Sequence, residues 1–496
     1  MEILADTTPI HTKETSALVI GCYQNESIDE NFFSNELNIE IKNNLNTFNK
    51  KFGVFSEFPT FSKISSKRIL FVGLGKRIDF SKDKSRIISG KIVVYCKEHS
   101  INDFAIVPFS NHDYLRSIVE GIILSSYSFS QLKTKFKEDE EIHYKLNHVS
   151  IMIDSSQKNI SDNLITKAKK ISEAVNFCRD ISNLPPNKCT PSFLANVAKE
   201  LSQQNSSLKT TIIDHKEMTS KNMNGILSVG KGSSNQPKLI LVEYKNTNSS
   251  NKKPILLVGK AVTFDSGGIS LKPSQNMDEM KFDKCGGVNV LAIMKALSVL
   301  DINTHVIGVI PSVENMPSEN SYRPSDIITM YNGINVEVLN TDAEGRMILA
   351  DALAYSINLY KPKTVIDMAT LTGACIIALG CNVAGIMGND RNLIKNLIHV
   401  SKNTDEHLWE LPLYDEYHKQ IKSDVADIKN MGGRQGGAIT AAAFLSNFVD
   451  NVPWVHIDIA GTAWIQDATI SKSYNPPGAT GFGVRTIIEY IISNND

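Results

Sequence analysis

The stretch PILLVGKAVTFDSGG, residues 254–268, decides the fold of this 496-residue chain. It opens with an unbroken apolar run of strand length, which is typical of an interior strand of a parallel sheet. Lys260 and Asp265 follow this run, and a Ser-Gly-Gly sequence then permits a tight turn with positive φ. Open α/β sheets bind ligands beyond the carboxyl ends of their strands. The stretch therefore predicts both an α/β fold and the sheet edge at which a functional site lies.

Similar apolar runs occur on both sides of this stretch. We interpret KLILVEY (238–244), HVIGVIP (305–311) and TVIDMA (364–369) as further interior parallel strands, with helical patterns between them. In the first 160 residues, strand-like runs such as RILFVGLG (68–75) also alternate with helical ones. This alternation predicts one α/β domain over residues 1–160 and a larger one over 191–496. A helical pattern that ends in a proline-rich segment predicts a connecting helix over 161–190.

Composition excludes several classes of protein. Fifty-two Lys and Arg balance 53 Asp and Glu, so nucleic acid is an unlikely partner. The seven cysteines show no CxxC spacing, which indicates a reduced, cytoplasmic protein. The first residues lack the pattern of a signal peptide. The uncharged segment 369–388 is too rich in glycine for a comfortable membrane span, so we expect no membrane association.

A second segment, NTDAEGRMILADAL (340–353), also places acidic residues among apolar ones. In an extended loop, residues i and i+2 point the same way, so Asp342 and Glu344 are expected to reach one site, with a helix beginning after Arg346. In the first segment, Lys272 follows the glycine turn and Asp283 opens the next helical run. The two segments together supply four carboxylates and three cations: Asp265, Asp283, Asp342, Glu344, Lys260, Lys272 and Arg346.

Four converging carboxylates repel one another unless they are protonated or bound to cations. Two divalent ions a few ångströms apart would relieve this repulsion, and such pairs of ions recur in hydrolytic enzymes. Oxygen-rich ligation suits Mn²⁺ or Mg²⁺, and Zn²⁺ also accepts it. A lysine ligand would need a depressed pKa. Exposed ion pairs are the alternative, but glycine turns and apolar runs are poor surroundings for them. The sequence has neither HExxH nor GxSxG, so it supports neither a zincin nor a serine hydrolase.

The heptapeptide NTDAEGR (340–346) resembles the signature of the leucyl aminopeptidases, also called cytosol aminopeptidases. Further segments resemble the family in the family order, among them GKAVTFDSGG (259–268), MKFDKCGG (280–287), ATLTGACIIALG (369–380) and HIDIAGTAW (456–464). The resemblance covers residues 170–490. It implies an N-terminal macro-domain-like α/β domain, a larger C-terminal α/β catalytic domain with a dinuclear metal site, and a homohexamer.

The resemblance also implies a role for each matching residue. One metal would be held by Lys260, Asp265, Asp283 and Glu344, and the other by Asp265, Asp342 and Glu344. Lys272 and Arg346 match the family's catalytic residues. The pocket for the first side chain would be lined by Met280, Thr370 and Ala463. Bicarbonate would bind main-chain groups near Ala343, Gly345 and Leu371, beside Arg346.

The activity implied is removal of N-terminal residues, leucine and other apolar ones preferentially, from peptide substrates during intracellular peptide turnover. Two ions, Mn²⁺ or Zn²⁺, would share an activated hydroxide, Lys272 would stabilise the oxyanion, and bicarbonate on Arg346 would carry the proton. An additional DNA-binding or regulatory role and an inactive scaffold are the alternatives. The balanced charge disfavours the first, and the intact set of seven polar residues disfavours the second.

Overall fold

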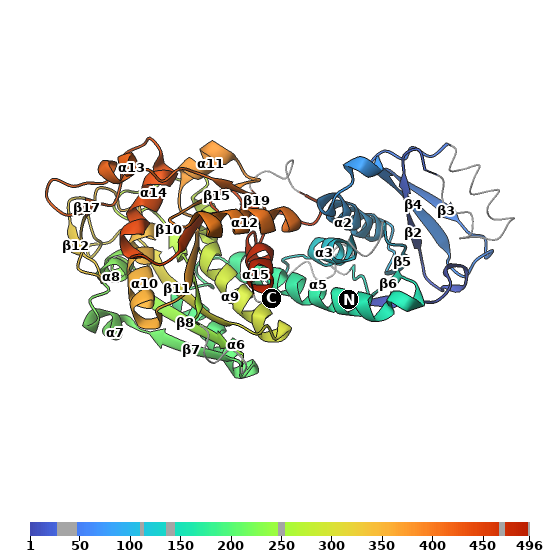
Figure 1. The fold of residues 1–496 in the computed structure, drawn as a ribbon, viewed down its shortest axis with the longest axis horizontal. Coiled ribbons are helices and arrows are strands. Elements are labelled where there is room, and N and C mark those ends of the chain that lie inside the picture. The colour runs from blue at the N-terminus through green and yellow to red at the C-terminus, as the bar shows by residue number, and fades with distance from the viewer. Residues whose placement is uncertain (27–46, 110–113, 135–143, 247–252, 466–471, 495–496) are drawn as a thin grey trace. The chain divides into compact units, whose positions relative to one another are not determined.

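The computed structural model describes residues 1–26, 47–109, 114–134, 144–246, 253–465 and 472–494 (Figure 1). The chain forms two compact units. The first comprises Met1–Glu173 with Asp467–Pro476, and the second Ala174–Gln466 with Pro477–Asp496. The division falls inside helix α5 (Lys158–Ser182), which occupies part of the segment predicted as a connector.

The first unit contains a six-stranded sheet in the order β1-β6-β5-β2-β4-β3. Its strands pair in parallel, except that β3 is antiparallel to β4. Buried apolar side chains of the strands and of helices α2 and α3 form one core, and other buried side chains of β2, β4, β5 and β6 form a second, smaller one. These elements are β1 (Glu2–Asp6), β2 (Leu18–Tyr23), β3 (Phe55–Pro59), β4 (Arg68–Gly75), α2 (Lys82–Glu98), β5 (Asp103–Ile106), α3 (Leu115–Ser125) and β6 (His148–Met152).

A short segment near the C-terminus also belongs to the first unit. Its described part, residues 472–476, contacts helix α2. The Tyr474 hydroxyl donates to Asp83 Oδ1 at 2.5 Å, and the Ser473 hydroxyl donates to the Ile87 carbonyl at 2.6 Å. The first unit is therefore built from two stretches of chain that are far apart in the sequence.

In the second unit, the described residues form a nine-stranded sheet in the order β16-β15-β18-β14-β9-β11-β8-β7, with β10 paired to β11. The strands are β7 (Leu208–Ile213), β8 (Lys238–Lys245), β9 (Ile255–Gly259), β10 (Ala261–Asp265), β11 (His305–Asn315), β14 (Thr364–Ala369), β15 (Ala384–Gly388), β16 (Leu408–Glu410) and β18 (Trp454–Asp458). Shorter strands form two small sheets: β12 (Ile327–Thr329), β13 (Asn335–Glu337) and β17 (Ile428–Lys429), and β19 (Trp464–Ile465) and β20 (Gly478–Ala479).

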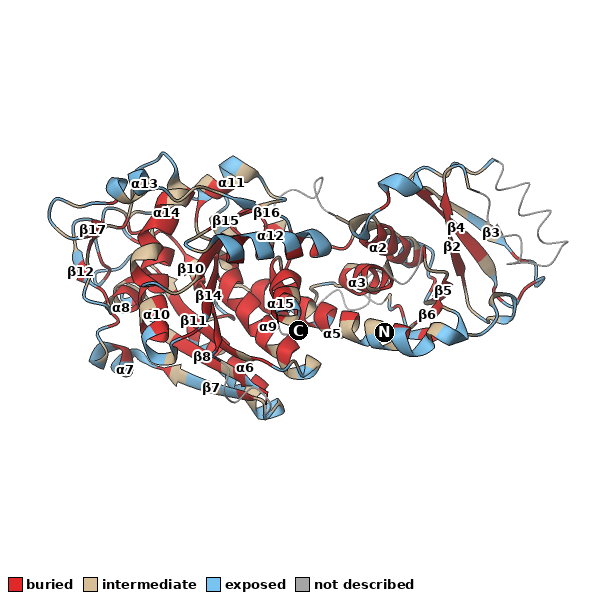
Figure 2. Ribbon diagram, viewed as in Figure 1, coloured by how far each residue is buried: buried red, intermediate tan, exposed pale blue. Residues whose placement is uncertain are grey.

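Helices cover both faces of the large sheet. Leu256 and Val258 of β9 share a core with α10 (Glu344–Tyr360), whereas Gly308 of β11 faces Val290 and Met294 of α9 (Cys285–Leu300). Both helices are buried over most of their length (Figure 2). The remaining helices are α6 (Pro191–Gln204), α7 (His215–Ser220), α8 (Asn224–Gly230), α11 (Gly373–Leu379), α12 (Arg391–Thr404), α13 (Asp415–Gln420), α14 (Gly437–Leu445) and α15 (Val484–Ser493).

The predicted α/β class is confirmed, but the predicted direction of one strand is wrong. Strand β8 was expected to be parallel, but it is antiparallel to both of its neighbours, β11 and β7. A continuous apolar run shows that both faces of a strand are buried and carries no information about its direction. Within the described residues, no helix is both long and apolar enough to cross a lipid bilayer.

Candidate metal centre

The candidate site lies where parallel strands of the large sheet end. Lys260 directly follows β9, Asp265 ends β10, Asn315 ends β11, and Thr370 directly follows β14. These strands are parallel neighbours, so their carboxyl ends meet at one edge of the sheet. The main chain thus brings together residues that are up to 110 positions apart, as the Lys260–Thr370 hydrogen bond shows.

Lys260 is a buried cation that lies among the carboxylates of this site, with 2% of its surface exposed. Its Nζ lies 2.8 Å from Asp283 Oδ1 and 2.8 Å from Glu344 Oε1, and it donates to the Thr370 carbonyl at 2.9 Å. Burial alone would lower the pKa of Lys260, but the facing carboxylates outweigh it and raise that pKa. A Cβ on Gly345 would lie 2.7 Å from Lys260 Nζ, so a larger residue at this position would displace the lysine side chain from its two carboxylates.

Lys272 is the second cation and is partly exposed. Its Nζ lies 2.8 Å from Asp265 Oδ2 and 2.5 Å from Asp342 Oδ1. Burial opposes its charge, but Asp265 and the other carboxylates raise its pKa above the usual value. The predicted turn is present: Gly267 has a φ of +87°, and Lys272 N donates to the Ser266 carbonyl at 2.9 Å. The turn therefore folds Lys272 back onto Asp265.

The carboxylates crowd one another. One oxygen each from Asp265, Asp342 and Glu344 lie within 4.8 Å of one another. Burial, followed by repulsion from Asp265 and Glu344, raises the pKa of Asp342 to about 7. Burial also raises the pKa of Asp283, although Lys260 lowers it in part, and Asp283 Oδ2 is buried without a hydrogen-bond partner. Crowded oxygen donors and a buried, unpartnered oxygen fit a site for divalent cations.

The local geometry of Asp342 and Glu344 differs from the prediction. Asp342 lies in a turn, and α10 begins at Glu344 instead of after Arg346. Both side chains still reach the same site. The turn and the start of the helix bring them there, whereas the prediction assumed an extended loop. Arg346 falls in the first turn of α10, where its Nη1 donates to the Asn430 carbonyl at 2.7 Å and its buried Nε has no partner. Burial lowers the pKa of Arg346 to about 10.

The residues expected to line the substrate pocket lie on three segments. The Thr370 hydroxyl donates to Asp283 Oδ1 at 2.8 Å, which places it at the cluster. Met280 lies in the 3-10 helix η7 (Met277–Phe282), and Ala463 precedes β19. The rings of Phe282 and Trp464 stack with centroids 5.5 Å apart, which holds these two segments together.

Two of the main-chain amides expected near bicarbonate already have partners. Leu371 N donates to Asp458 Oδ1 at 3.2 Å, and Ala343 N donates to the Asn340 carbonyl at 3.3 Å. Gly345 lies in the first turn of α10, whose N–H groups find no acceptor within the helix. Arg346 and Gly345 are therefore the better placed donors for an anion.

Sequence reasoning missed two residues at this edge of the sheet, one that contacts Asp265 and one that contacts the loop after β14. Asn315 Nδ2 donates to Asp265 Oδ1 at 2.8 Å and to the Thr341 carbonyl at 3.1 Å. Asp458 binds the loop that follows β14. Both end strands of the large sheet. Their position at the carboxyl ends of strands was the available signal.

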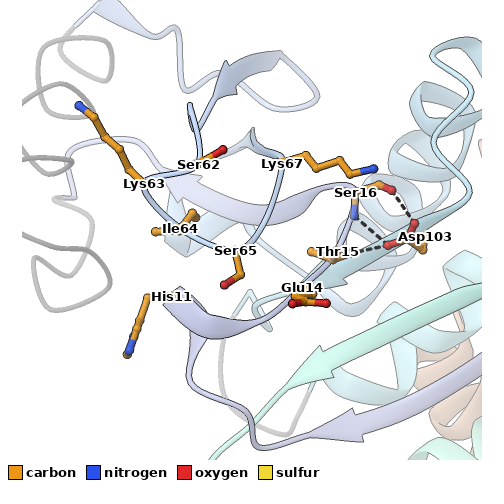
Figure 3. A pocket seen from close by; sticks show the side chains of 10 residues that line it. All are labelled: His11, Glu14, Thr15, Ser16, Ser62, Lys63, Ile64, Ser65, Lys67 and Asp103. Atoms are coloured by element: carbon orange, nitrogen blue, oxygen red, sulfur yellow. Dashed lines mark hydrogen bonds between the residues drawn. The ribbon is translucent and has the colours of Figure 1, made fainter.

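The first unit contains an open cavity of about 630 Å³ of a different kind. Its carboxylate Asp103 accepts hydrogen bonds from Ser16 N at 2.8 Å, Ser16 Oγ at 2.5 Å and Thr15 Oγ1 at 2.8 Å (Figure 3). The Lys63 side chain extends away from Asp103 in this view. Asp103 thus ties strand β5 to the segment before β2, and Glu14 is a second carboxylate in the lining of this cavity.

Comparison with known proteins adds evidence from outside the chain. The model of the cytosol aminopeptidase family, catalytic domain, matches residues 176–488, and the model of its N-terminal domain matches residues 19–136. A probable cytosol aminopeptidase of Cenarchaeum symbiosum (strain A) is 45% identical over 430 residues, which are 86% of each chain. The cytosol aminopeptidase of Haemophilus influenzae (strain ATCC 51907 / DSM 11121 / KW20 / Rd) is 38% identical over 97% of each chain. Among solved structures, the bottromycin maturation enzyme BotP in complex with Mn is similar, with a TM-score of 0.85 and 27% identity over 97% of this chain and 100% of that one.

Proposed function

The chain belongs to the cytosol aminopeptidase family, and from this premise we propose that it removes N-terminal residues, leucine and other apolar ones preferentially, from peptides. Membership supports a metal-dependent aminopeptidase, that is, a hydrolase of peptide bonds. The observation that carries the proposal is the cluster of Asp265, Asp342 and Glu344, whose oxygens lie within 4.8 Å of one another. Crowded, largely buried carboxylates are costly unless they bind cations, which disfavours an inactive scaffold.

The same cluster supports the proposed metal ligands. Lys260, Asp265, Asp283 and Glu344 would hold one divalent ion, and Asp265, Asp342 and Glu344 the other, with Mn²⁺ or Zn²⁺ as the ions. Divalent ions supply Lewis acidity and activate water at neutral pH when they are bound. An ammonium has no lone pair, so Lys260 would have to give up its proton to act as a ligand, and a bound dication would favour that loss by repelling the charged form.

Lys272 is proposed to donate a hydrogen bond to the oxyanion that develops on the scissile carbonyl. Its ammonium is held by two carboxylates but keeps 22% of its side chain exposed, so a substrate atom can approach it. A preorganised donor of this kind stabilises a transition state by about 3–4 kcal/mol.

Arg346 is proposed to hold bicarbonate, which would take a proton from water and pass it to the leaving amine. The buried, unpartnered Nε of Arg346 supports an anion at this position. Met280, Thr370 and Ala463 are proposed to line the pocket for the first side chain, where Met280 and Ala463 would provide apolar contacts. The family resemblance is the basis for a homohexamer. The seven free cysteines, six of them buried, support a cytoplasmic location.

The experiment is hydrolysis of leucine p-nitroanilide by the full chain before and after treatment with a chelator. Chelation is expected to abolish hydrolysis, and Mn²⁺ or Zn²⁺ is expected to restore it. The same assay on an N-acetylated substrate is the control, because an aminopeptidase needs a free amine. Full activity in chelated, metal-free protein would refute the two-metal proposal. Cleavage of the acetylated substrate would refute the exopeptidase proposal.

A further inference from the structure

Asp458 lies directly beside the loop that carries Thr370. Strands β14 and β18 are parallel neighbours, with Ala369 paired to Asp458, so both end at the same point of the sheet. One more main-chain bond, from Ile459 N to the Ala369 carbonyl at 2.8 Å, extends the pairing. The loop of residues 370–372 leaves β14 at this point.

The carboxylate of Asp458 is fully buried, and it is used to fix this loop. Its Oδ1 accepts from Leu371 N at 3.2 Å and from Ala460 N at 3.1 Å, and its Oδ2 accepts from the Thr372 hydroxyl at 2.6 Å. Within the described part of the chain, no lysine or arginine forms an ion pair with it. A buried carboxylate is costly unless hydrogen bonds of this kind are complete. The positions of Leu371 and Thr372 are therefore set by Asp458.

Thr372 fixes the far end of the loop as well. Its hydroxyl donates a hydrogen bond to Asp458. As the N-cap of α11, the same hydroxyl oxygen accepts a hydrogen bond from Cys375 N at 3.1 Å. A hydroxyl has a single proton, so the direction of this hydrogen bond is determined. The loop is thus held by β18 on one side and by α11 on the other.

The opposite side of the loop contacts two of the proposed metal ligands. The Thr370 carbonyl accepts from Lys260 Nζ at 2.9 Å, and the Thr370 hydroxyl donates to Asp283 Oδ1 at 2.8 Å. Lys260 and Asp283 are proposed ligands of the same metal ion and of that ion alone. We propose that Asp458 is a positioning residue for this metal site, acting through residues 370–372 on Lys260 and Asp283. The inference rests on the proposed function, because it assigns Asp458 to one of the two proposed metal sites.

The test is titration of the full chain with Mn²⁺, in which the electron paramagnetic resonance signal of free Mn²⁺ gives the number of bound ions and their dissociation constants. Loss of a residue that orients metal ligands lowers metal affinity about 10- to 100-fold. Asp458→Ala is expected to lower the affinity for one of the two ions by this factor and to leave the affinity for the other unchanged. Asp458→Asn is expected to have a smaller effect, because an amide keeps one acceptor oxygen for Leu371 N.

Asp351→Ala is the matched control. Asp351 is also a fully buried carboxylate that accepts main-chain bonds, from Tyr331 N at 2.8 Å and Ile226 N at 3.1 Å. It makes no hydrogen bond or ion pair with residues 370–372 or with the cluster in the described structure. Its loss is expected to lower thermal stability but to leave both Mn²⁺ dissociation constants unchanged. Equal weakening in both alanine variants would overturn the inference, because it would mark a general effect of buried carboxylates.

Thr372→Val provides a second route if Asp458→Ala does not fold. It retains the side-chain volume but removes the hydroxyl, and it is expected to lower the affinity for the same ion that Asp458→Asn affects. The combined variant is expected to be less than additive, because both changes break one connection. Parent-like Mn²⁺ binding in Asp458→Asn and Thr372→Val would overturn the inference alone, provided that the parent binds two ions and hydrolyses leucine p-nitroanilide. A parent chain that binds no Mn²⁺ and is inactive would overturn the proposed function together with it.

Discussion

Replacing Lys272 separates its effect on the reaction from any effect on metal binding. Lys272→Met removes the ammonium but keeps an unbranched side chain of similar length, so packing around the partly exposed stem changes little. The ammonium contacts Asp265 at 2.8 Å and Asp342 at 2.5 Å. The variant therefore removes one hydrogen-bond donor and two ion pairs at a single point.

Removing the ammonium is expected to affect kcat and metal binding differently. Removing one oxyanion donor lowers kcat about 10²- to 10³-fold, which corresponds to about 3–4 kcal/mol. Removing a positive charge beside two carboxylates strengthens their attraction for divalent cations or leaves it unchanged. Lys272→Met is therefore expected to lose kcat while it retains two metal ions per chain.

The assay is steady-state hydrolysis of leucine p-nitroanilide together with elemental analysis of the same preparation. Lys295→Met is the matched control, because its ammonium lies 4.3 Å from the ring centroid of Phe177 and pairs with no carboxylate of the cluster. This control is expected to keep the parent kcat. A near-parent kcat in Lys272→Met would refute the oxyanion role. A loss of metal that matches the loss of kcat would show that Lys272 acts on the metal site instead.

Four further outcomes are expected. Asp283→Ala is expected to lose one metal ion per chain by elemental analysis, and an unchanged count would show that Asp283 is not a ligand. Burial raises the pKa of Asp351 to about 7, against about 3.9 in an unfolded chain, so the folded state holds the extra proton between these values. The parent's free energy of unfolding is therefore expected to fall by up to about 4 kcal/mol, relative to Asp351→Asn, between pH 4 and pH 7 in urea titrations; equal slopes would contradict this. Glu120→Ala removes the carboxylate that lies 2.6 Å from buried Arg86 Nε. The free energy of unfolding of the first unit in urea is therefore expected to fall by about 3–5 kcal/mol, and a change below about 1 kcal/mol would contradict this. Gel shifts with duplex DNA at physiological salt are expected to be negative, and a salt-dependent shift would establish the DNA-binding alternative.

Much of the site could be predicted because its residues lie next to strong local signals. The apolar run before Lys260 and the glycine turn after Asp265 fix where a strand ends and where the chain reverses. Lys272 then contacts Asp265, seven residues away in the sequence, because of that turn. A contact that depends on a short, well-marked piece of chain is visible in its sequence.

Other contacts could not be predicted because they depend on strand order. Asn315 reaches Asp265 only because β10 pairs with β11, and Asp458 reaches Leu371 only because β18 pairs with β14. Apolar periodicity records burial, and neither the partner nor the direction of a strand follows from it. The antiparallel β8 shows the same limit.

The sequence by itself determined the α/β class, the strand ends that bear charged residues, and the set of acidic and basic side chains that a metal site requires. Only the tertiary structure decided that Asp265, Asp342 and Glu344 lie within 4.8 Å of one another and that Lys260 bridges Asp283 and Glu344. The physical reason is that local propensity and burial act over a few residues along the chain, whereas distances between carboxylates are set by how strands pair and where helices begin.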